Sequence, residues 1–101
     1  MILVRDVFRL KFGKARDAMA TWKEMSELSA RLGWQPGTIR ILTDLVGPYY
    51  TLVMETTFQD LATWEKEIHR GFEDPEWRAA YQKFTPLVES GHREIFNVLN
   101  V

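Results

Sequence analysis

One acidic residue interrupts the apolar face of a predicted N-terminal strand. Residues 2–12 alternate between two faces, as a strand does. The apolar face carries Ile2, Val4, Phe8, Leu10 and Phe12. Asp6 falls on this same face, where a carboxylate is costly unless it is paired or lines a polar cavity. Asp6 is therefore a candidate catalytic residue, and the alternative is a structural carboxylate hydrogen-bonded to a helix or to a tryptophan N–H.

The two histidines of the chain do not form a common motif. His69 follows Trp64 by five residues on a predicted helix, which separates the two side chains by about 140° around the helix axis. Glu65 lies four residues before His69, a spacing typical of an exposed pair, and a catalytic role for His69 is the alternative. His92 shares one strand face with Glu94. Because a metal site generally needs three or four ligands, these residues predict no metal site.

A second group of charged residues is expected on the other face of the predicted sheet. Its members are Arg5, Arg9, Arg40 and Glu55. We favour structural ion pairs among them, and the alternative is a site for the anionic group of a small ligand.

Composition excludes several classes of function. The 101 residues are 46% hydrophobic and 13% aromatic, which indicates one folded domain over residues 1–101 with a modest core. A net charge of -1 gives no field to hold nucleic acid. The absence of cysteine excludes disulfides and thiolate chemistry. Charges at Arg5 and Asp6 come too early for a signal sequence or membrane span, so we expect a cytoplasmic protein.

Four strands and three helices are expected to position these residues. A helical stripe that includes Ala18, Met19 and Trp22 follows the first strand and ends at Gly33. Residues 38–43 and 49–58 predict a hairpin.

The second half of the chain predicts two helices and a final strand. Thr57-Phe58-Gln59-Asp60 has the form of a capping box, and a helix with Leu61, Trp64 and Ile68 on its buried face runs to Arg70 and breaks at Gly71. Asp74-Pro75-Glu76-Trp77 then predicts a sharp helix start. That helix ends near Pro86, and a strand over 95–99 follows a break at Ser90-Gly91.

The element order β-α-β-β-α-α-β predicts an α+β, ferredoxin-like fold. Its four-stranded antiparallel sheet carries all helices on one face. The other face is half apolar, with Leu3, Val7 and Val53 among its charges, and such faces are typical of interaction surfaces. Packing two sheets face to face relieves the small core, so the sequence predicts a homodimer through the open face.

The C-terminal half resembles a known family. Asp74-Pro75-Glu76-Trp77, followed by Thr85-Pro86-Leu87-Val88 and Glu94-Ile95, is similar to the closing pattern of the NIPSNAP-like branch of the dimeric α+β barrel superfamily. The resemblance implies a ferredoxin-like subunit that pairs with a second copy into a dimeric barrel. It carries no catalytic set, since functions diverge on this fold.

The resemblance also implies a ligand in the cleft between sheet and helices. We therefore predict a homodimer that binds a small hydrophobic or aromatic ligand there, without a tightly bound cofactor. The predicted pocket residues are Trp22, Trp64, Trp77, Tyr81 and His92, although aromatic residues at helical spacing are also typical of a core. If the protein is an enzyme, the superfamily implies a cofactor-independent monooxygenase in which Asp6 or His69 takes or positions a phenolic proton.

Two other functions stay open at this point. One is a non-catalytic dimerisation or interaction module without a ligand. The other is a haem-degrading monooxygenase, because Asp6, Trp64 and His69 occupy places loosely similar to the Asn, Trp and His of those relatives. Asp in place of Asn and the short spacing from Trp64 to His69 both depart from that arrangement.

Overall fold

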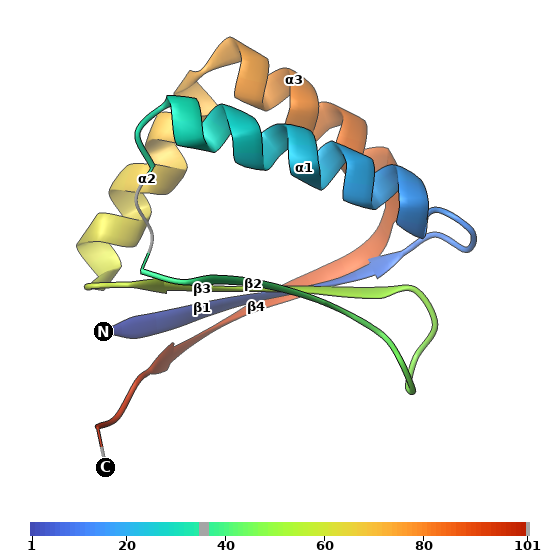
Figure 1. The fold of residues 1–101 in the computed structure, drawn as a ribbon, viewed down its shortest axis with the longest axis horizontal. Coiled ribbons are helices and arrows are strands. Elements are labelled where there is room, and N and C mark those ends of the chain that lie inside the picture. The colour runs from blue at the N-terminus through green and yellow to red at the C-terminus, as the bar shows by residue number, and fades with distance from the viewer. Residues whose placement is uncertain (35–36, 101) are drawn as a thin grey trace.

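An antiparallel sheet covered on one face by helices makes up the molecule (Figure 1). The computed structural model describes residues 1–34 and 37–100. The elements are β1 (Ile2–Leu10), α1 (Ala15–Arg31), β2 (Ile39–Thr43), β3 (Thr51–Phe58), α2 (Leu61–Glu73), α3 (Pro75–Phe84), the 3-10 turn η1 (Thr85–Leu87) and β4 (Val88–Asn97). The predicted βαββααβ order and α+β, ferredoxin-like fold are confirmed. No helix of the described ranges is long and apolar enough to cross a membrane.

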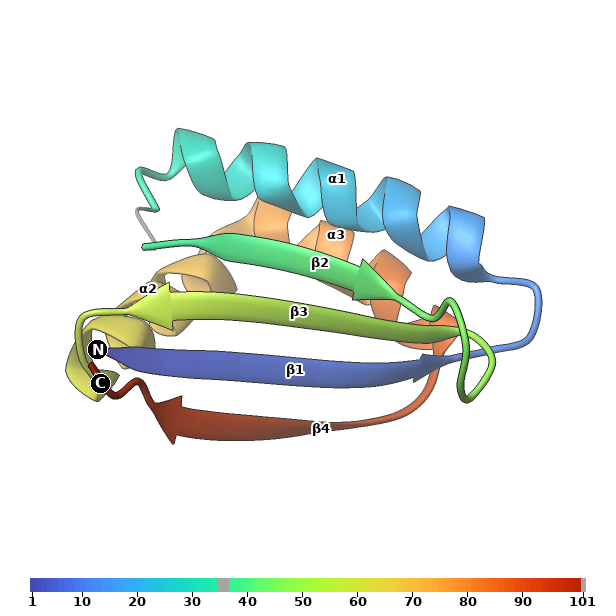
Figure 2. The same ribbon diagram turned by 60° about the horizontal axis from the view of Figure 1, so that its bottom comes forward.

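The four strands lie in the order β2-β3-β1-β4, and every neighbouring pair is antiparallel (Figure 2). The register places Arg5 opposite Glu55 on β3 and opposite Glu94 on β4. Asp6, one residue further along β1, lies opposite Arg93 on β4. Since successive side chains of a strand point to opposite faces, Arg5 and Asp6 belong to different faces of the sheet.

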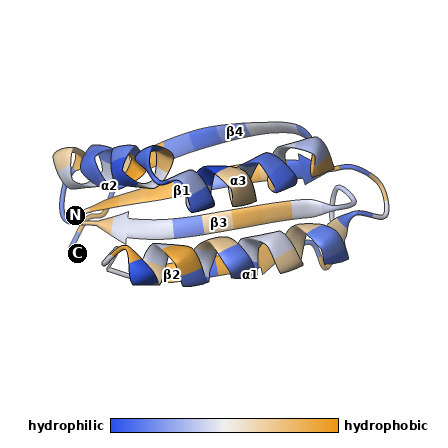
Figure 3. Cartoon of the chain, turned by 90° about the horizontal axis from the view of Figure 1, so that it is seen from above, coloured by the Kyte–Doolittle hydropathy of each residue, from blue (hydrophilic) through white to orange (hydrophobic). Residues whose placement is uncertain are grey.

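The core lies between the sheet and helices α1 and α3. Its buried members are Leu10, Ala18, Met25, Leu28, Leu52, Ala80 and Phe84. The ring of Phe8 meets that of Phe84 edge to face, with centroids 5.0 Å apart. Hydrophilic and hydrophobic segments alternate along the helices in Figure 3, as expected of helices that bury one face against a sheet.

Two residues predicted for the buried helix faces are exposed instead. Met19 of α1 is 38% exposed and Leu61 of α2 is 48% exposed. In α1 the buried face is centred further round the helix and includes Thr21, whose hydroxyl donates a hydrogen bond of 3.0 Å to the carbonyl oxygen of Asp17. That bond satisfies the polar atom, so a threonine can take a place that the hydropathy pattern assigned to an apolar residue.

The start of α3 follows the sequence prediction, whereas the start of α2 differs from it. Asp74 caps α3 by accepting a hydrogen bond of 2.8 Å from the backbone N–H of Trp77. Asp60 caps α2 through the backbone N–H of Thr63 at 2.8 Å and its hydroxyl at 2.7 Å. The hydroxyl bond and then the backbone bond of Thr63 lower the pKa of Asp60. The predicted capping box was wrong because Thr57 belongs to β3.

Two glycines that were predicted to break the chain lie inside regular elements. Helix α2 continues past Gly71 to Glu73, and a methyl group at Gly71 would lie 3.3 Å from the indole of Trp77. Strand β4 begins at Val88, passes through Gly91 and ends at Asn97. A methyl group at Gly91 would lie 3.0 Å from the carbonyl oxygen of Val7. Both glycines therefore permit close packing and do not end an element.

Other boundaries shift by a few residues. β1 ends at Leu10, and Phe12, which was predicted on its apolar face, is 78% exposed. β3 begins at Thr51 because Tyr50 has a positive φ of 59° in the turn before it. Gly33 follows α1 with a φ of 79°, as predicted for the residue after a helix end. The predicted connection over 34–37 includes residues 35 and 36, which lie outside the described residues.

Candidate functional site

A cavity of about 120 Å³ lies between the sheet and its three helices. This volume is similar to that of protein cavities that hold one benzene-sized group. Strands β1, β3 and β4 and helices α1, α2 and α3 all contribute side chains to its wall. All four tryptophans of the chain, Trp22, Trp34, Trp64 and Trp77, line it.

The helical side of the cavity is built from contacting aromatic rings. Trp77 and Tyr81 lie four residues apart on α3 and stack with centroids 5.5 Å apart and an interplanar angle of 9°. The ring of Phe72 on α2 meets both of them edge to face. The indole N–H of Trp77 donates to the hydroxyl of Ser29 on α1 at 3.2 Å. These contacts hold the rings in fixed positions at the cavity wall.

Asp6 is buried on the sheet side of the cavity and is paired. Its side chain is 9% exposed, and its Oδ1 accepts a hydrogen bond of 2.6 Å from Nε of Arg93. The guanidinium carbon of Arg93 lies 5.1 Å from the ring centroid of Trp64, within the range of a cation–π contact. The cross-strand register of β1 and β4 brings the two charged groups together. Asp6 thus has a hydrogen-bond partner, as the structural alternative predicted, but this partner is Arg93 and not a tryptophan N–H.

A second pair of charges, Glu67 and Arg70, lies on α2. Nη1 of Arg70 is 3.5 Å from Oε2 of Glu67 and also donates to the carbonyl oxygen of Leu32 at 3.3 Å. The Glu67 side chain is only 12% exposed. Its Oε2 makes this ion pair but accepts no hydrogen bond among the described residues.

Four buried polar atoms at the cavity wall have no hydrogen-bond partner in ranges 1–34 and 37–100. They are Nε1 of Trp22, Nε1 of Trp34, Oγ1 of Thr56 and Oε2 of Glu67. Leaving a buried polar atom unpaired costs about 1–3 kcal/mol. Two indole donors, one hydroxyl and one carboxylate oxygen thus surround an apolar space, and this is the pattern of a site for a small aromatic molecule that carries polar substituents.

Five of the seven sequence-predicted site residues meet at this cavity. They are Asp6, Trp22, Trp64, Trp77 and Tyr81. His69 is exposed on α2 and does not belong to the cavity wall. His92 lies opposite Val7 in the sheet register and therefore on the face without helices. The placement of His92 in the pocket was wrong for this reason, whereas its shared face with Glu94 is confirmed by a distance of 2.9 Å between Nε2 and Oε1.

Sequence reasoning missed several residues of the cavity. The missed polar residues are Trp34, Thr56, Glu67, Arg70 and Arg93. Glu67 follows Trp64 by three residues, and this helical spacing was available as a signal. Arg93 shares the strand face of Ile95, but its contact with Asp6 depends on a β1–β4 register that no local pattern reveals.

The cavity limits which bound groups fit. Its volume of about 120 Å³ suits one small ring. Within the described ranges no three His, Cys, Asp or Glu side chains are grouped so that they would hold a metal ion.

Comparisons with known proteins bear on the fold and the family. The sequence matches the family model NIPSNAP over residues 5–100. An uncharacterized NIPSNAP domain protein from Burkholderia xenovorans has a similar structure, with a TM-score of 0.84 and 16% identity over 98% of this chain and 95% of that chain. A NIPSNAP family protein from Agrobacterium tumefaciens aligns with a TM-score of 0.85 and 18% identity over 98% of this chain and 86% of that chain.

A third structure comes from another group of proteins with the same fold. It is a proposed antibiotic biosynthesis monooxygenase from Nitrosomonas europaea, with a TM-score of 0.77 and 14% identity over 99% of this chain and all of that chain. At these identities the likeness concerns the fold. No curated protein matches the sequence.

Proposed function

The chain belongs to the NIPSNAP family, and from this premise we propose that it is a homodimer that binds one small aromatic or hydrophobic ligand between the sheet and the helices. One observation carries the ligand-binding proposal. The described cavity of about 120 Å³ combines an aromatic wall with four buried polar atoms that have no hydrogen-bond partner among the described residues. A core that served packing alone would gain stability from filling this space and pairing these atoms.

The polar atoms suggest the chemical class of the ligand. A single planar ring matches the volume and can contact the faces of the surrounding indoles. A carbonyl or hydroxyl oxygen on that ring would accept hydrogen bonds from Nε1 of Trp22 or Trp34. A hydroxyl group would donate to Oε2 of Glu67. We therefore propose a monocyclic phenol or a hydroxylated aromatic ketone as the ligand class.

Tryptophan fluorescence tests this proposal directly, because every tryptophan of the chain lines the cavity. Titration with phenols should quench or shift the emission, and the matched ring hydrocarbons should bind more weakly. Trp22→Phe keeps a ring and removes the N–H. We expect it to weaken phenol binding about 10-fold, the value of one hydrogen bond, and to leave hydrocarbon binding nearly unchanged.

His69→Gln is the matched control, since His69 is exposed outside the cavity wall. Its affinities should equal those of the wild type. If no compound of either set binds the wild-type protein, the ligand proposal fails and the interaction module becomes the better description. If Trp22→Phe lowers the affinity for hydrocarbons and phenols equally, the ligand does not use this N–H.

Oxygenation of the bound aromatic is the second candidate function. The fold similarity to the Nitrosomonas europaea protein and the carboxylate of Glu67 favour it. A carboxylate that accepts a phenolic proton makes the ring electron-rich. Dissolved oxygen would be the co-substrate: one oxygen atom enters the ring, the other leaves as water, and the phenol itself supplies the electrons as it becomes a quinone. Glu67 takes this role more readily than Asp6, because its oxygen lies 3.5 Å from Arg70 and accepts no hydrogen bond, whereas Oδ1 of Asp6 accepts one of 2.6 Å from Arg93.

Oxygen uptake with a binding phenol tests the catalytic proposal. Glu67→Gln should abolish uptake while binding persists, because the amide cannot take the proton. Asp6→Ala should reduce affinity or rate through the loss of Arg93 positioning. If the wild-type protein binds phenols without consuming oxygen, the catalytic proposal fails and the ligand-binding proposal stands.

A further inference from the structure

Two arginines lie where the aromatic cavity meets the solvent. Arg93 of β4 and Arg70 of α2 line the cavity wall, and their side chains remain 45% and 38% exposed. Asp6 and Glu67, the carboxylates of the described wall, are only 9% and 12% exposed. A group that enters the cavity from solvent therefore reaches the positive charges first, since the negative charges lie deeper and already face the arginines.

Arg93 is held in place by contacts from two other elements. Its Nε donates a hydrogen bond of 2.6 Å to Oδ1 of Asp6 on β1. Its guanidinium carbon lies over the ring of Trp64 on α2, 5.1 Å from the centroid. These contacts engage the Nε side and one face of the guanidinium. They leave the edge formed by Nη1 and Nη2 for another partner.

The terminal nitrogens of Arg93 carry unused donors. A guanidinium has five N–H groups, of which Nε supplies one and the two Nη atoms supply four. Within ranges 1–34 and 37–100, the hydrogen bond and the ion pair of the Arg93 side chain both use Nε. The edge formed by Nη1 and Nη2 matches the two oxygens of a carboxylate, which it can bind through two parallel hydrogen bonds.

Arg70 is less suited to the same role. Its Nη1 lies 3.5 Å from Oε2 of Glu67 and donates to the carbonyl oxygen of Leu32 at 3.3 Å. The terminal edge of its guanidinium is therefore already in use. Of the two arginines, Arg93 is the one whose terminal edge can receive an anion without the loss of a contact within the chain.

We infer that Arg93 binds a carboxylate of the ligand through Nη1 and Nη2, at the place where the cavity opens to solvent. The inference rests on the proposed ligand-binding function and narrows its ligand class to hydroxylated monocyclic aromatic acids. The cavity of about 120 Å³ receives the ring. The carboxylate lies at the half-exposed arginine, where its charge is paired and remains partly hydrated.

Comparison of an acid with its amide tests the inference on the wild-type protein. 3-Hydroxybenzoate and 4-hydroxybenzoate each have a neutral amide of nearly the same shape. In isothermal titration calorimetry at pH 7, the better-binding acid should bind at least about 10-fold more tightly than its amide, because hydrogen bonds to a charged group are stronger than those to a neutral one. If neither acid binds more tightly than its amide, the inference is wrong.

Substitution of Arg93 tests the assignment of the anchor. Arg93→Gln removes the charge and the paired terminal donors. It should lower the affinity for the acid at least about 10-fold and change the affinity for the amide less than about 3-fold. An acid affinity equal to that of the wild type would overturn the assignment.

Arg93→Lys keeps the inference testable if Arg93→Gln does not fold, since it leaves a positive charge beside Asp6. An ammonium group lacks the planar edge that binds both carboxylate oxygens. The preference for the acid should therefore fall below that of the wild type, while the amide binds as before. A full wild-type preference in Arg93→Lys would overturn binding through Nη1 and Nη2.

Two further variants locate the anion. Arg78→Gln makes the same charge change at an exposed residue outside the cavity wall, so it should change neither affinity. Arg70→Gln should lower the affinity for the acid less than Arg93→Gln does. The reverse order would place the carboxylate at Arg70. Equal losses in all three variants would mean that net charge matters and that no single arginine anchors the ligand, and either result overturns the assignment.

The outcomes also separate this inference from the proposed function. If the wild-type protein binds phenols but shows no preference for an acid over its amide, the ligand-binding proposal stands and the carboxylate site fails. If it binds neither phenols nor acids nor amides, both fail.

Discussion

At the residue scale, Asp6 is a buried carboxylate that is tolerated because it has a charged partner. Its place on an apolar strand face is unfavourable for a free carboxylate. Arg93 offsets that cost by a hydrogen bond of 2.6 Å, and its guanidinium carbon lies 5.1 Å from the ring centroid of Trp64. The resulting chain of contacts joins β1, β4 and α2 at the cavity wall. The residue that was a candidate base from sequence thus has a structural partner, and its catalytic role stays a prediction.

Thr56→Val should stabilise the protein while it weakens ligand binding. Thr56 is 2% exposed, and its hydroxyl has no partner in the described part of the chain. Removal of an unpaired buried hydroxyl should raise the free energy of unfolding by about 1 kcal/mol. Urea denaturation measures this change, and fluorescence titration with a phenol measures the loss of affinity.

The control for Thr56→Val is Thr21→Val, because the hydroxyl of Thr21 is buried but hydrogen-bonded to Asp17. This variant should not be stabilised. A loss of stability in Thr56→Val would show that the hydroxyl has a partner in solution and would weaken the argument for a ligand.

At the element scale, the start of α2 depends on one capping carboxylate. The hydrogen bonds from Thr63 lower the pKa of Asp60 below its ordinary value of 3.8. A carboxyl whose pKa is lower in the folded state contributes stability above its unfolded pKa and loses it as pH falls through the folded value. The ionised cap therefore stabilises the folded state at neutral pH, and this contribution is lost in acid as Asp60 is protonated.

Asp60→Ala should therefore lower the melting temperature at pH 7 and have little effect at a pH well below 3.8. Thermal denaturation followed by circular dichroism across this range measures the difference. Asp60→Asn separates the two contributions, since the amide oxygen still caps the helix but carries no charge. If the difference in melting temperature between the wild type and Asp60→Ala does not depend on pH, the charge of Asp60 does not contribute to the cap.

Strand β4 depends on a glycine for its close approach to β1. A methyl group at Gly91 would lie 3.0 Å from the carbonyl oxygen of Val7 and 3.1 Å from the ring of Phe8. Because a backbone carbonyl in a central strand cannot move freely, Gly91→Ala should destabilise the protein by about 1–3 kcal/mol. Ser90→Ala, at the neighbouring position, is the control for urea denaturation. Equal stability of the two variants would show that β4 can shift away from β1.

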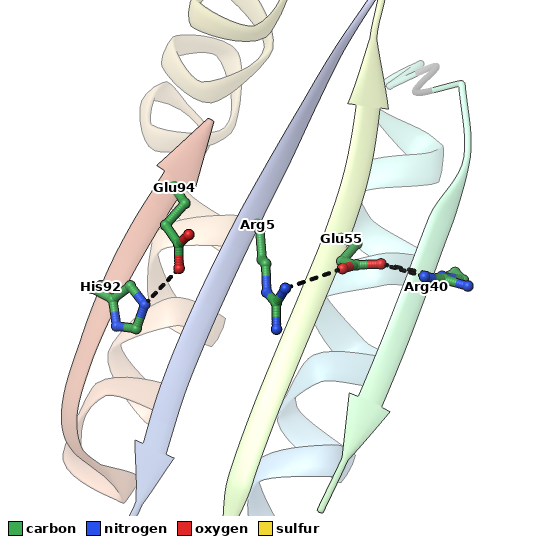
Figure 4. A network of polar contacts seen from close by, with 5 residues as sticks. All are labelled: Arg5, Arg40, Glu55, His92 and Glu94. Carbon is green, nitrogen blue, oxygen red and sulfur yellow. Dashed lines mark hydrogen bonds and ion pairs between the residues drawn. The ribbon is translucent and has the colours of Figure 1, made fainter. Parts of the chain in front are cut away.

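On the scale of the whole molecule, the two faces of the sheet carry different groups. The helix-covered face lines the aromatic cavity, and the open face carries the charged residues Arg5, Arg40, Glu55 and Glu94 (Figure 4). Strands β1 and β3 contribute to both faces through alternate residues, so the proposed dimer would stiffen the floor of the cavity without contacting it.

The proposed dimer predicts that stability depends on protein concentration. Association favours the folded state by mass action, so the melting temperature of the wild type should rise as the protein is concentrated. Differential scanning calorimetry over a wide range of concentrations provides the measurement. A constant melting temperature for the wild type would contradict a dimer that dissociates on unfolding.

The sequence by itself determined the elements and their order. Strand alternation, helical stripes, the cap at Asp74 and the glycine after α1 are local signals, and local sterics and hydrogen bonding act within a few residues. The apolar face of β1 and the aromatic stripe of α3 likewise followed from periodicity. These signals were sufficient for the ferredoxin-like fold and for part of the aromatic wall, namely Trp22, Trp64, Trp77 and Tyr81.

Only the tertiary structure decided which polar groups meet. The partner of Asp6 lies on β4, and the pairing follows from a register set by packing between distant strands. Gly71 and Gly91 resemble chain breaks locally, but neighbouring elements that approach them closely require a residue without a side chain. Oγ1 of Thr56 and Oε2 of Glu67 have no hydrogen-bond partner among the described residues. This depends on which side chains distant elements place near them, and a local sequence pattern contains no information on that.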